Sequence, residues 1–223
     1  MQNKDDKKFL VDWKFLNSSK IFLLNGSGVK LENFTNLTDP SGIITICFAA
    51  RMIRDKGIIE FVTAARIIKN RGIKARFYIA GDLDLHNPST LRSEYVDKLK
   101  RDPCVEVIGY HKDIPDLYSK SHIICLPSYR EGLPKSLQEA AAASRAVVTT
   151  DVPGCRDAII PGITGLLVPS KDPDKLADAL QWLIEHPKER IDMGKAGRKL
   201  AEEKFSIEKI TKNHLDIYNQ ILN

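Results

Sequence analysis

Strand-like and helix-like segments alternate along the middle of this chain, and that alternation limits the folds it can adopt. Continuous apolar runs of strand length are separated by segments whose apolar residues recur at helical spacing. Strands are predicted over residues 43–50, 75–80, 105–108, 123–126, 146–149 and 166–168. Helices are predicted over residues 58–69, 91–100, 114–119, 135–143 and 174–185. Regular alternation of this kind predicts an α/β fold with a six-stranded parallel sheet and helices on both faces.

The two ends of the chain depart from this alternation. Residues 1–40 contain a single strand-like run, residues 21–24, followed by a turn and a polar stretch. After Pro173 the chain is predicted to be helical, with two further helices over residues 188–204 and 207–222.

Several residues suited to binding fall immediately after predicted strands. Arg51, Gly81, Gly109 and Glu131 each follow a strand. In parallel sheets, ligands bind at the carboxyl ends of the strands. We therefore expect these residues to gather on one edge of the sheet.

The segment from Glu131 to Glu139 carries the strongest chemical signal. A glycine loop follows a buried strand, and Pro134 suits the first turn of a helix that would contain Glu139. Free N–H groups and a positive dipole at a helix N-terminus attract phosphate. A phosphate-binding helix N-terminus with a carboxylate on each side, able to accept hydrogen bonds from hydroxyls, is suited to bind a phosphorylated polyol such as a nucleotide sugar.

Composition argues against several classes of protein. The net charge of +5 is mild, and the Lys and Arg residues are scattered, which argues against nucleic acid as a partner. The four cysteines are far apart, as expected for buried reduced thiols rather than for a metal site or a disulfide. The chain opens on polar residues, and its longest apolar runs have only strand length. We therefore expect a cytoplasmic location.

Motifs along nearly the whole chain resemble the retaining glycosyltransferases of family four, which have the GT-B fold. Residues 127–134 with Glu139 resemble the E-x7-E signature of that family, and residues 50–57 resemble its Arg-x4-Lys-Gly diphosphate motif. Residues 26–34 resemble the interdomain turn of the family, and residues 77–82 resemble its second strand and turn. Residues 150–157 and 162–168 resemble two later family motifs.

The resemblance implies that this chain is half of a GT-B fold. Family members have an N-terminal domain for the acceptor and a C-terminal Rossmann-like domain for the nucleotide sugar, and the matched motifs belong to the second. Residues 1–40 would be an interdomain junction, residues 41–205 the donor domain, and residues 206–223 a helix that packs toward the N-terminal domain. The implied partners are a nucleotide sugar and that domain, and peripheral association with the inner membrane face through that domain stays open.

The resemblance also implies roles for individual residues. Arg51 and Lys56 would bind the diphosphate, where fixed cations lower the barrier to bond cleavage. Glu139 would accept the ribose hydroxyls, and Glu131 would contact the donor hexose or support the reacting centre. Backbone contacts to the donor are expected around Ser128, Gly132 and Leu133, and the base would pack near Gly81, Gly109 and Tyr110.

The implied reaction is transfer of a hexose or N-acetylhexosamine, with retention, from a nucleotide diphosphate sugar that is UDP-linked by default. The acceptor would be a glycan or a lipid-linked acceptor. No acidic cluster offers Mg²⁺ its preferred oxygen ligands beside the diphosphate motif, so we expect neither a metal nor another cofactor. The chain alone is expected to bind the donor but to transfer nothing, because orientation of the acceptor supplies much of the rate.

Other interpretations remain open at this stage. The main alternative is a non-catalytic module that binds a nucleotide or a sugar phosphate. Arg51 and Lys56 could be a solvated surface pair, and Glu139 could be a capping carboxylate at a helix N-terminus.

Three residues depart from the family pattern. Ser144 stands where glycine is usual, Ala146 where proline is usual, and Lys30 where aspartate is usual. A left-handed helix end at Ser144 would be strained relative to glycine.

Overall fold

The computed structural model describes residues 1–35 and 37–222 of the chain. Asn36, in the predicted junction, and Asn223, the last residue of the predicted C-terminal segment, lie outside the described residues.

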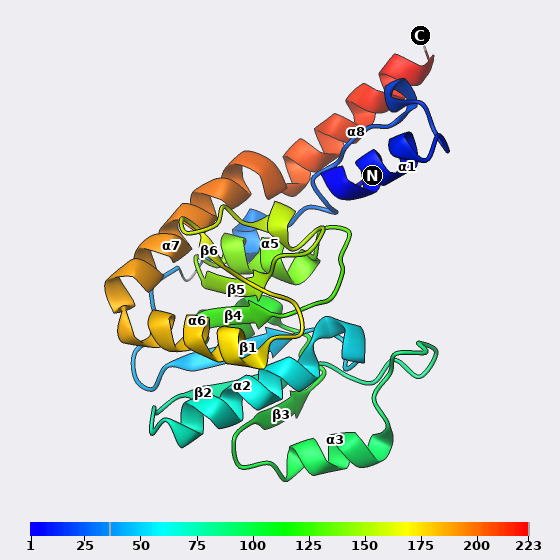
Figure 1. The fold of residues 1–223 in the computed structure, drawn as a ribbon. Helices are drawn as coiled ribbons and strands as arrows, with labels where there is room; N and C mark the ends of the chain where they lie inside the picture. Colours follow the sequence, from blue (N-terminus) through cyan, green and yellow to red (C-terminus); the bar gives the residue numbers. More distant parts are fainter. Residues whose placement is uncertain (36, 223) are drawn as a thin grey trace.

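Six parallel strands form one sheet, as the alternating pattern predicts (Figure 1). The strands are β1 (Thr45–Ala49), β2 (Arg76–Ala80), β3 (Glu106–Gly109), β4 (Ile123–Leu126), β5 (Ala146–Thr150) and β6 (Gly165–Val168). Their order across the sheet is β3-β2-β1-β4-β5-β6, with Ile46 of β1 opposite Ile123 of β4. Strand order therefore reverses between β1 and β4, the position at which doubly wound sheets open a binding crevice.

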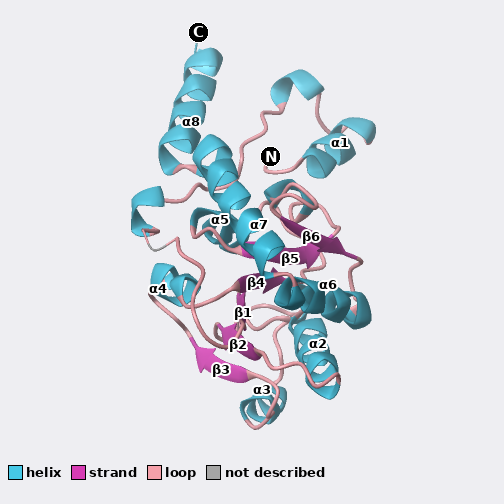
Figure 2. Ribbon diagram, turned by 90° about the vertical axis from the view of Figure 1, so that its left-hand side faces the viewer, coloured by secondary structure: helices cyan, strands magenta, loops and turns pink. Residues whose placement is uncertain are grey.

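Helices cover both faces of the sheet. Those of the domain body are α2 (Ile58–Asn70), α3 (Ser93–Lys100), α4 (Ile114–Ser119), α5 (Lys135–Ala142), α6 (Pro173–Glu185) and α7 (Pro187–Leu200). Helices α2 and α6 pack together on one side, whereas α4 lies on the other side (Figure 2). Because helices cover both faces, every residue of β4 and β5 is buried, as their apolar sequences predict.

The N-terminal region differs from its prediction. The predicted strand over residues 21–24 is wrong, because these residues form no strand, and Leu24 instead donates its N–H to the carbonyl of Met1 (2.8 Å). Helix α1 (Lys4–Asp12) was not predicted. Its sequence is polar, and it buries no residue, so it lacks the apolar periodicity on which the prediction relied. The available signal was Asn3 as N-cap, with Asp5 and Asp6 in the first turn.

The N-terminal segment crosses the start of the last helix at Val29, where backbone hydrogen bonds join them. Val29 donates its N–H to Phe205 (2.8 Å), and its carbonyl accepts from Ile207 (2.9 Å). A π-helical turn (Ala201–Phe205) ends α7, and α8 (Ile207–Leu222) then projects from the domain toward the end of the molecule where α1 lies (Figures 1 and 2).

Ser144 adopts the left-handed conformation that its position after α5 predicts, with φ of +56°. We expect Ser144→Gly to raise the free energy of unfolding by up to about 1 kcal/mol. The relieved left-handed strain outweighs the extra freedom of glycine in the unfolded chain. Urea denaturation would measure the change. Ser136→Gly, inside α5, is the control and should lower the free energy of unfolding by about 0.5 kcal/mol. A loss of stability in Ser144→Gly would contradict the strain argument.

Candidate functional site

Two loops face each other where the strand order reverses. The loop after β1, residues 50–57, carries Arg51 and Lys56, and the loop after β4, residues 127–134, carries Ser128, Glu131 and Gly132. The second loop leads directly into α5, so Gly132 and Leu133 lie just before the N-terminus of that helix. The topology therefore brings two fixed cations and a helix N-terminus to the same edge of the sheet.

A cavity of about 480 Å³ opens at this edge. It is lined by the ends of β1 and β2, by the loops after β1, β2 and β3, by the start of α4, and by Glu139 of α5. Four of the predicted binding residues line it: Arg51, Gly81, Tyr110 and Glu139. Tyr110 is largely exposed at its rim. The lining thus includes the aromatic ring of Tyr110, the cation of Arg51 and three acidic residues, Asp82, Asp84 and Glu139.

Arg51 lies at the mouth of the cavity. Its side chain is 58% exposed, and its guanidinium forms an ion pair with Asp84 at 2.5 Å. Exposed pairs of this kind contribute little to stability, so a phosphate could replace Asp84 at low cost. Asp84 was not predicted as a binding residue, although its position just after β2 was a signal for this edge.

Lys56 forms an ion pair with Glu131 of the facing loop. Its ammonium group contacts the Oε1 atom of Glu131, and the hydroxyl of Ser128 donates to the same oxygen at 2.6 Å. All three side chains are largely buried. Charge-assisted contacts at this burial hold the two loops together, and the ammonium group has further donors for a ligand.

Gly57 brings these loops into backbone contact. Its φ is +76°, and a Cβ atom there would lie far inside van der Waals contact with the carbonyl oxygen of Pro127. Gly81, just after β2, packs equally closely against the segment after β1, because a Cβ atom at Gly81 would collide with the carbonyl of Ala50. Gly81 also donates its N–H to Gly109 at 2.8 Å. Glycine is therefore needed at both positions because backbone occupies the space of a side chain.

Glu139 is a buried acid that lines the cavity. Burial raises the pKa of its carboxyl to about 7, and Lys135, at 4.0 Å, acts weakly in the opposite direction. Pro134 is the N-cap of α5 and Glu139 is the fifth residue of the helix, so its carboxylate does not cap the helix end. In its ionised form this carboxyl would accept hydrogen bonds from ligand hydroxyls.

His111 lines the same cavity, although it belongs to none of the sequence motifs described above. Its Nε2 atom is buried and has no hydrogen-bond partner among the described residues. Asp116 is the nearest acid, at 3.8 Å from that nitrogen. A donor or acceptor of a bound ligand would satisfy this nitrogen.

Within residues 1–35 and 37–222, none of the helices is long and apolar enough to cross a membrane. No three His, Cys, Asp or Glu side chains in this part of the chain are grouped so that they could hold a metal ion.

The comparisons with solved structures agree on the fold. A glycosyltransferase from Rickettsia africae superimposes with a TM-score of 0.87 at 22% identity, covering 99% of this chain and 62% of that one. Anabaena HepE in complex with UDP gives a TM-score of 0.84 at 15% identity, covering 98% of this chain and 63% of that one. The C-terminal domain of LpcC, a glycosyl transferase group 1 family protein from Francisella tularensis, is 26% identical with a TM-score of 0.68; the match covers 81% of this chain and 100% of that one.

Curated relatives share more sequence but are longer. N,N'-diacetylbacillosaminyl-diphospho-undecaprenol alpha-1,3-N-acetylgalactosaminyltransferase of Campylobacter jejuni is 31% identical over 67% of this chain and 38% of the relative. The capsular polysaccharide biosynthesis glycosyltransferase CapM of Staphylococcus aureus is 32% identical over 79% of this chain and 46% of the relative. This chain thus spans less than half the length of these relatives.

The profile of the family described as glycosyl transferases group 1 matches residues 29–200, which is well over half of the chain. The match runs from Val29 at the crossing point to the end of α7 and includes both loops of the crevice. This chain therefore belongs to the group 1 glycosyl transferase family.

Proposed function

We propose that this chain binds the nucleotide diphosphate sugar of a retaining glycosyl transfer, with a UDP-linked hexose or N-acetylhexosamine as donor. The observation that carries the proposal is the sheet edge where the strand order reverses. There the loop with Arg51 and Lys56 lies in backbone contact with the loop that leads into the N-terminus of α5. Negative charge grows on the diphosphate as the glycosidic bond breaks, and preset cations and N–H groups stabilise it there. The UDP complex of HepE supports a uridine nucleotide, since that protein shares the fold.

The cavity provides a place for the rest of the donor. Glu139 accepts the ribose hydroxyls, and the base packs against the chain near Gly81, Gly109 and Tyr110. Glu131 and the backbone of Gly132 and Leu133 contact the sugar and the distal phosphate. Attack from the front face, with the leaving phosphate helping to deprotonate the acceptor, then retains the configuration of the donor sugar.

An acceptor-binding domain is the proposed second half of the enzyme. Apolar side chains are exposed on α1 and α8: Phe9, Trp13, Leu215, Tyr218 and Ile221. Both helices lie at one end of the molecule (Figure 1). A group of large apolar side chains exposed at one end of a molecule is typical of an interaction surface. We propose that the N-terminal domain packs there, that the acceptor is a glycan or is lipid-linked, and that the whole enzyme works in the cytoplasm.

Isothermal titration with UDP, ADP and GDP tests donor binding by this chain. We expect UDP to bind weakly and to bind equally well in EDTA, because two cations and a helix N-terminus neutralise the phosphates. We also expect no transfer from a UDP-sugar by the chain alone, because the acceptor is not held in place. Binding abolished by EDTA would contradict the metal-free proposal, and turnover would contradict the requirement for a second domain. If a longer protein that includes the second domain also transfers no sugar, the alternative function is a nucleotide-binding module without catalytic activity.

Removal of either cation should selectively weaken diphosphate binding. We expect Arg51→Ala and Lys56→Ala each to reduce UDP affinity about tenfold or more, while uridine affinity stays nearly unchanged. Arg54→Ala is the control, because Arg54 lies in the same 3-10 turn as Lys56 and is exposed. Titration calorimetry with both ligands measures the effect. Equal losses for UDP and uridine would place the diphosphate elsewhere.

A further inference from the structure

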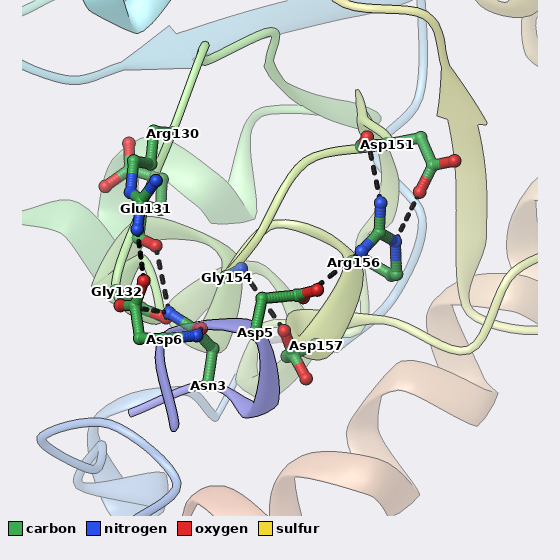
Figure 3. A network of polar contacts seen from close by, with 10 residues as sticks. All are labelled: Asn3, Asp5, Asp6, Arg130, Glu131, Gly132, Asp151, Gly154, Arg156 and Asp157. Atoms are coloured by element: carbon green, nitrogen blue, oxygen red, sulfur yellow. Dashed lines mark hydrogen bonds and ion pairs between the residues drawn. The ribbon is translucent and has the colours of Figure 1, made fainter. Parts of the chain in front are cut away.

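The N-terminal segment lies against the loop that carries Glu131 and Gly132. Asn3 is only 2% exposed, although it is the third residue of the chain. Its side-chain Nδ2 donates to the carbonyls of Glu131 (3.3 Å) and Gly132 (3.0 Å) and to the carboxylate of Asp6 (2.8 Å). Its Oδ1 accepts from the N–H of Asp6 (2.7 Å) and caps α1. Figure 3 shows this amide turned toward the loop backbone. One side chain thus serves both the helix and the loop.

Two ion pairs extend the contact. Asp6 pairs with Arg130 of the same loop, and Asp5 pairs with Arg156 at 3.2 Å in the segment after β5 (Figure 3). Arg156 is itself held by Asp151 at 2.5 Å. These pairs are exposed and contribute little each, so the buried amide of Asn3 is the specific part of the contact.

The segment after β5 contacts the same loop. The N–H of Glu131 donates to Pro153 at 3.1 Å, and a Cβ atom at Gly154 would clash with the carbonyls of Glu131 and Gly132. Gln2 also lies close to Gly132, with its Oε1 atom 2.5 Å from the position of a Cβ atom there. The loop is therefore enclosed by residues 2–3 and residues 153–154, and its peptide groups have little freedom.

We propose that Asn3 is a positioning residue for the donor loop, a role that rests on the proposed function. A trans peptide is planar, and its N–H points opposite to its C=O. Because Asn3 holds the carbonyls of Glu131 and Gly132, the N–H groups of Gly132 and Leu133 point away from Asn3. These are the two N–H groups that would bind the distal phosphate. Fixing them before the ligand arrives removes the cost of ordering them during binding.

Asn3→Asp keeps the oxygen that caps α1 but removes every hydrogen bond that the Nδ2 atom donates, to the two loop carbonyls and to the carboxylate of Asp6. Aspartate is as good an N-cap as asparagine, so α1 keeps its cap. The donor to the loop is lost, and a carboxylate oxygen then faces the two carbonyls. We expect UDP affinity to fall about threefold to tenfold with uridine affinity unchanged, and the amide resonances of Gly132 and Leu133 to shift. Asn3→Ser keeps a capping oxygen, but its side chain is too short to reach the loop carbonyls. Its UDP affinity should lie between that of the unmodified chain and that of Asn3→Asp.

Asn17→Asp is the matched control. Asn17 caps the short 3-10 helix Ser18–Lys20 through its Oδ1 atom, and it is exposed. This variant should bind UDP like the unmodified chain. Unchanged UDP affinity in Asn3→Asp, or equal losses for UDP and uridine, would overturn the positioning role while leaving donor binding intact. An unmodified chain that binds no UDP would overturn the proposed function and this role together.

Discussion

Gly57→Ala is expected to lower the free energy of unfolding by on the order of 3 kcal/mol and to weaken UDP binding. A left-handed φ costs an L-residue about 1 to 2 kcal/mol, and insertion of an atom into packed space costs about 1 to 3 kcal/mol more. The new methyl group would collide with the carbonyl of Pro127, which is backbone and cannot rotate away. The loops after β1 and β4 would separate, and the contact between Lys56 and Glu131 would be disturbed. Urea denaturation and UDP titration would measure the two effects.

Gly72→Ala is a close control for this substitution. Gly72 has the same φ of +76°, but a Cβ atom there meets no atom of the described chain within 4 Å. We expect it to cost only the left-handed strain, about 1 kcal/mol, and to leave UDP affinity unchanged. The difference between the two variants isolates the contact with Pro127. Equal losses of stability would show that the loops are not held together at this point.

Glu139→Gln is expected to stabilise the free chain at pH 8 while weakening nucleotide binding. The pKa of Glu139 is raised from 4.5 to about 7 by burial, so the folded state favours its protonated form. The free energy of unfolding is therefore highest, as far as Glu139 affects it, below pH 4.5. It falls as the pH rises from 4.5 through about 7, because the buried carboxyl ionises. At about 1.4 kcal/mol per pKa unit, the ionised acid costs on the order of 3 kcal/mol at pH 8. Glutamine does not ionise, so the variant avoids this cost.

The measurement is the free energy of unfolding of both proteins at pH 5 and pH 8. The two proteins should differ by less than about 1 kcal/mol at pH 5, and the Gln variant should be more stable by on the order of 3 kcal/mol at pH 8. UDP affinity of the unmodified chain should rise through pH 7, because hydroxyl donors favour the ionised carboxylate, whereas that rise should be absent in the variant. The same titration on Glu139→Gln corrects for protonation of UDP itself. Parallel pH profiles would show that Glu139 neither pays a burial cost nor contacts the ligand.

Much of the fold could be predicted from local pattern. The bounds of β4, α4 and α8 agree with the predicted ranges, and the other strands and helices of the alternating region agree to within a few residues. Helix α1 escaped prediction because a helix without a buried face has no apolar period to detect. Residues 21–24 were mistaken for a strand because a short apolar run does not reveal whether a neighbouring strand is available to pair with it.

The sequence by itself determined the order of the elements, the parallel sheet, and the edge at which Arg51, Gly81 and Glu131 gather. Those features depend on side-chain periodicity and on the handedness of strand connections, which are local. Only the tertiary structure decided that Arg51 pairs with Asp84, that Lys56 pairs with Glu131, and that Asn3 holds the loop beyond Glu131. These partners are 33, 75 and 129 residues apart, so their contacts exist only once backbone packing has brought the loops together. Burial of Glu139 likewise arises from elements packed around it, and this is why its pKa could not be predicted from the sequence.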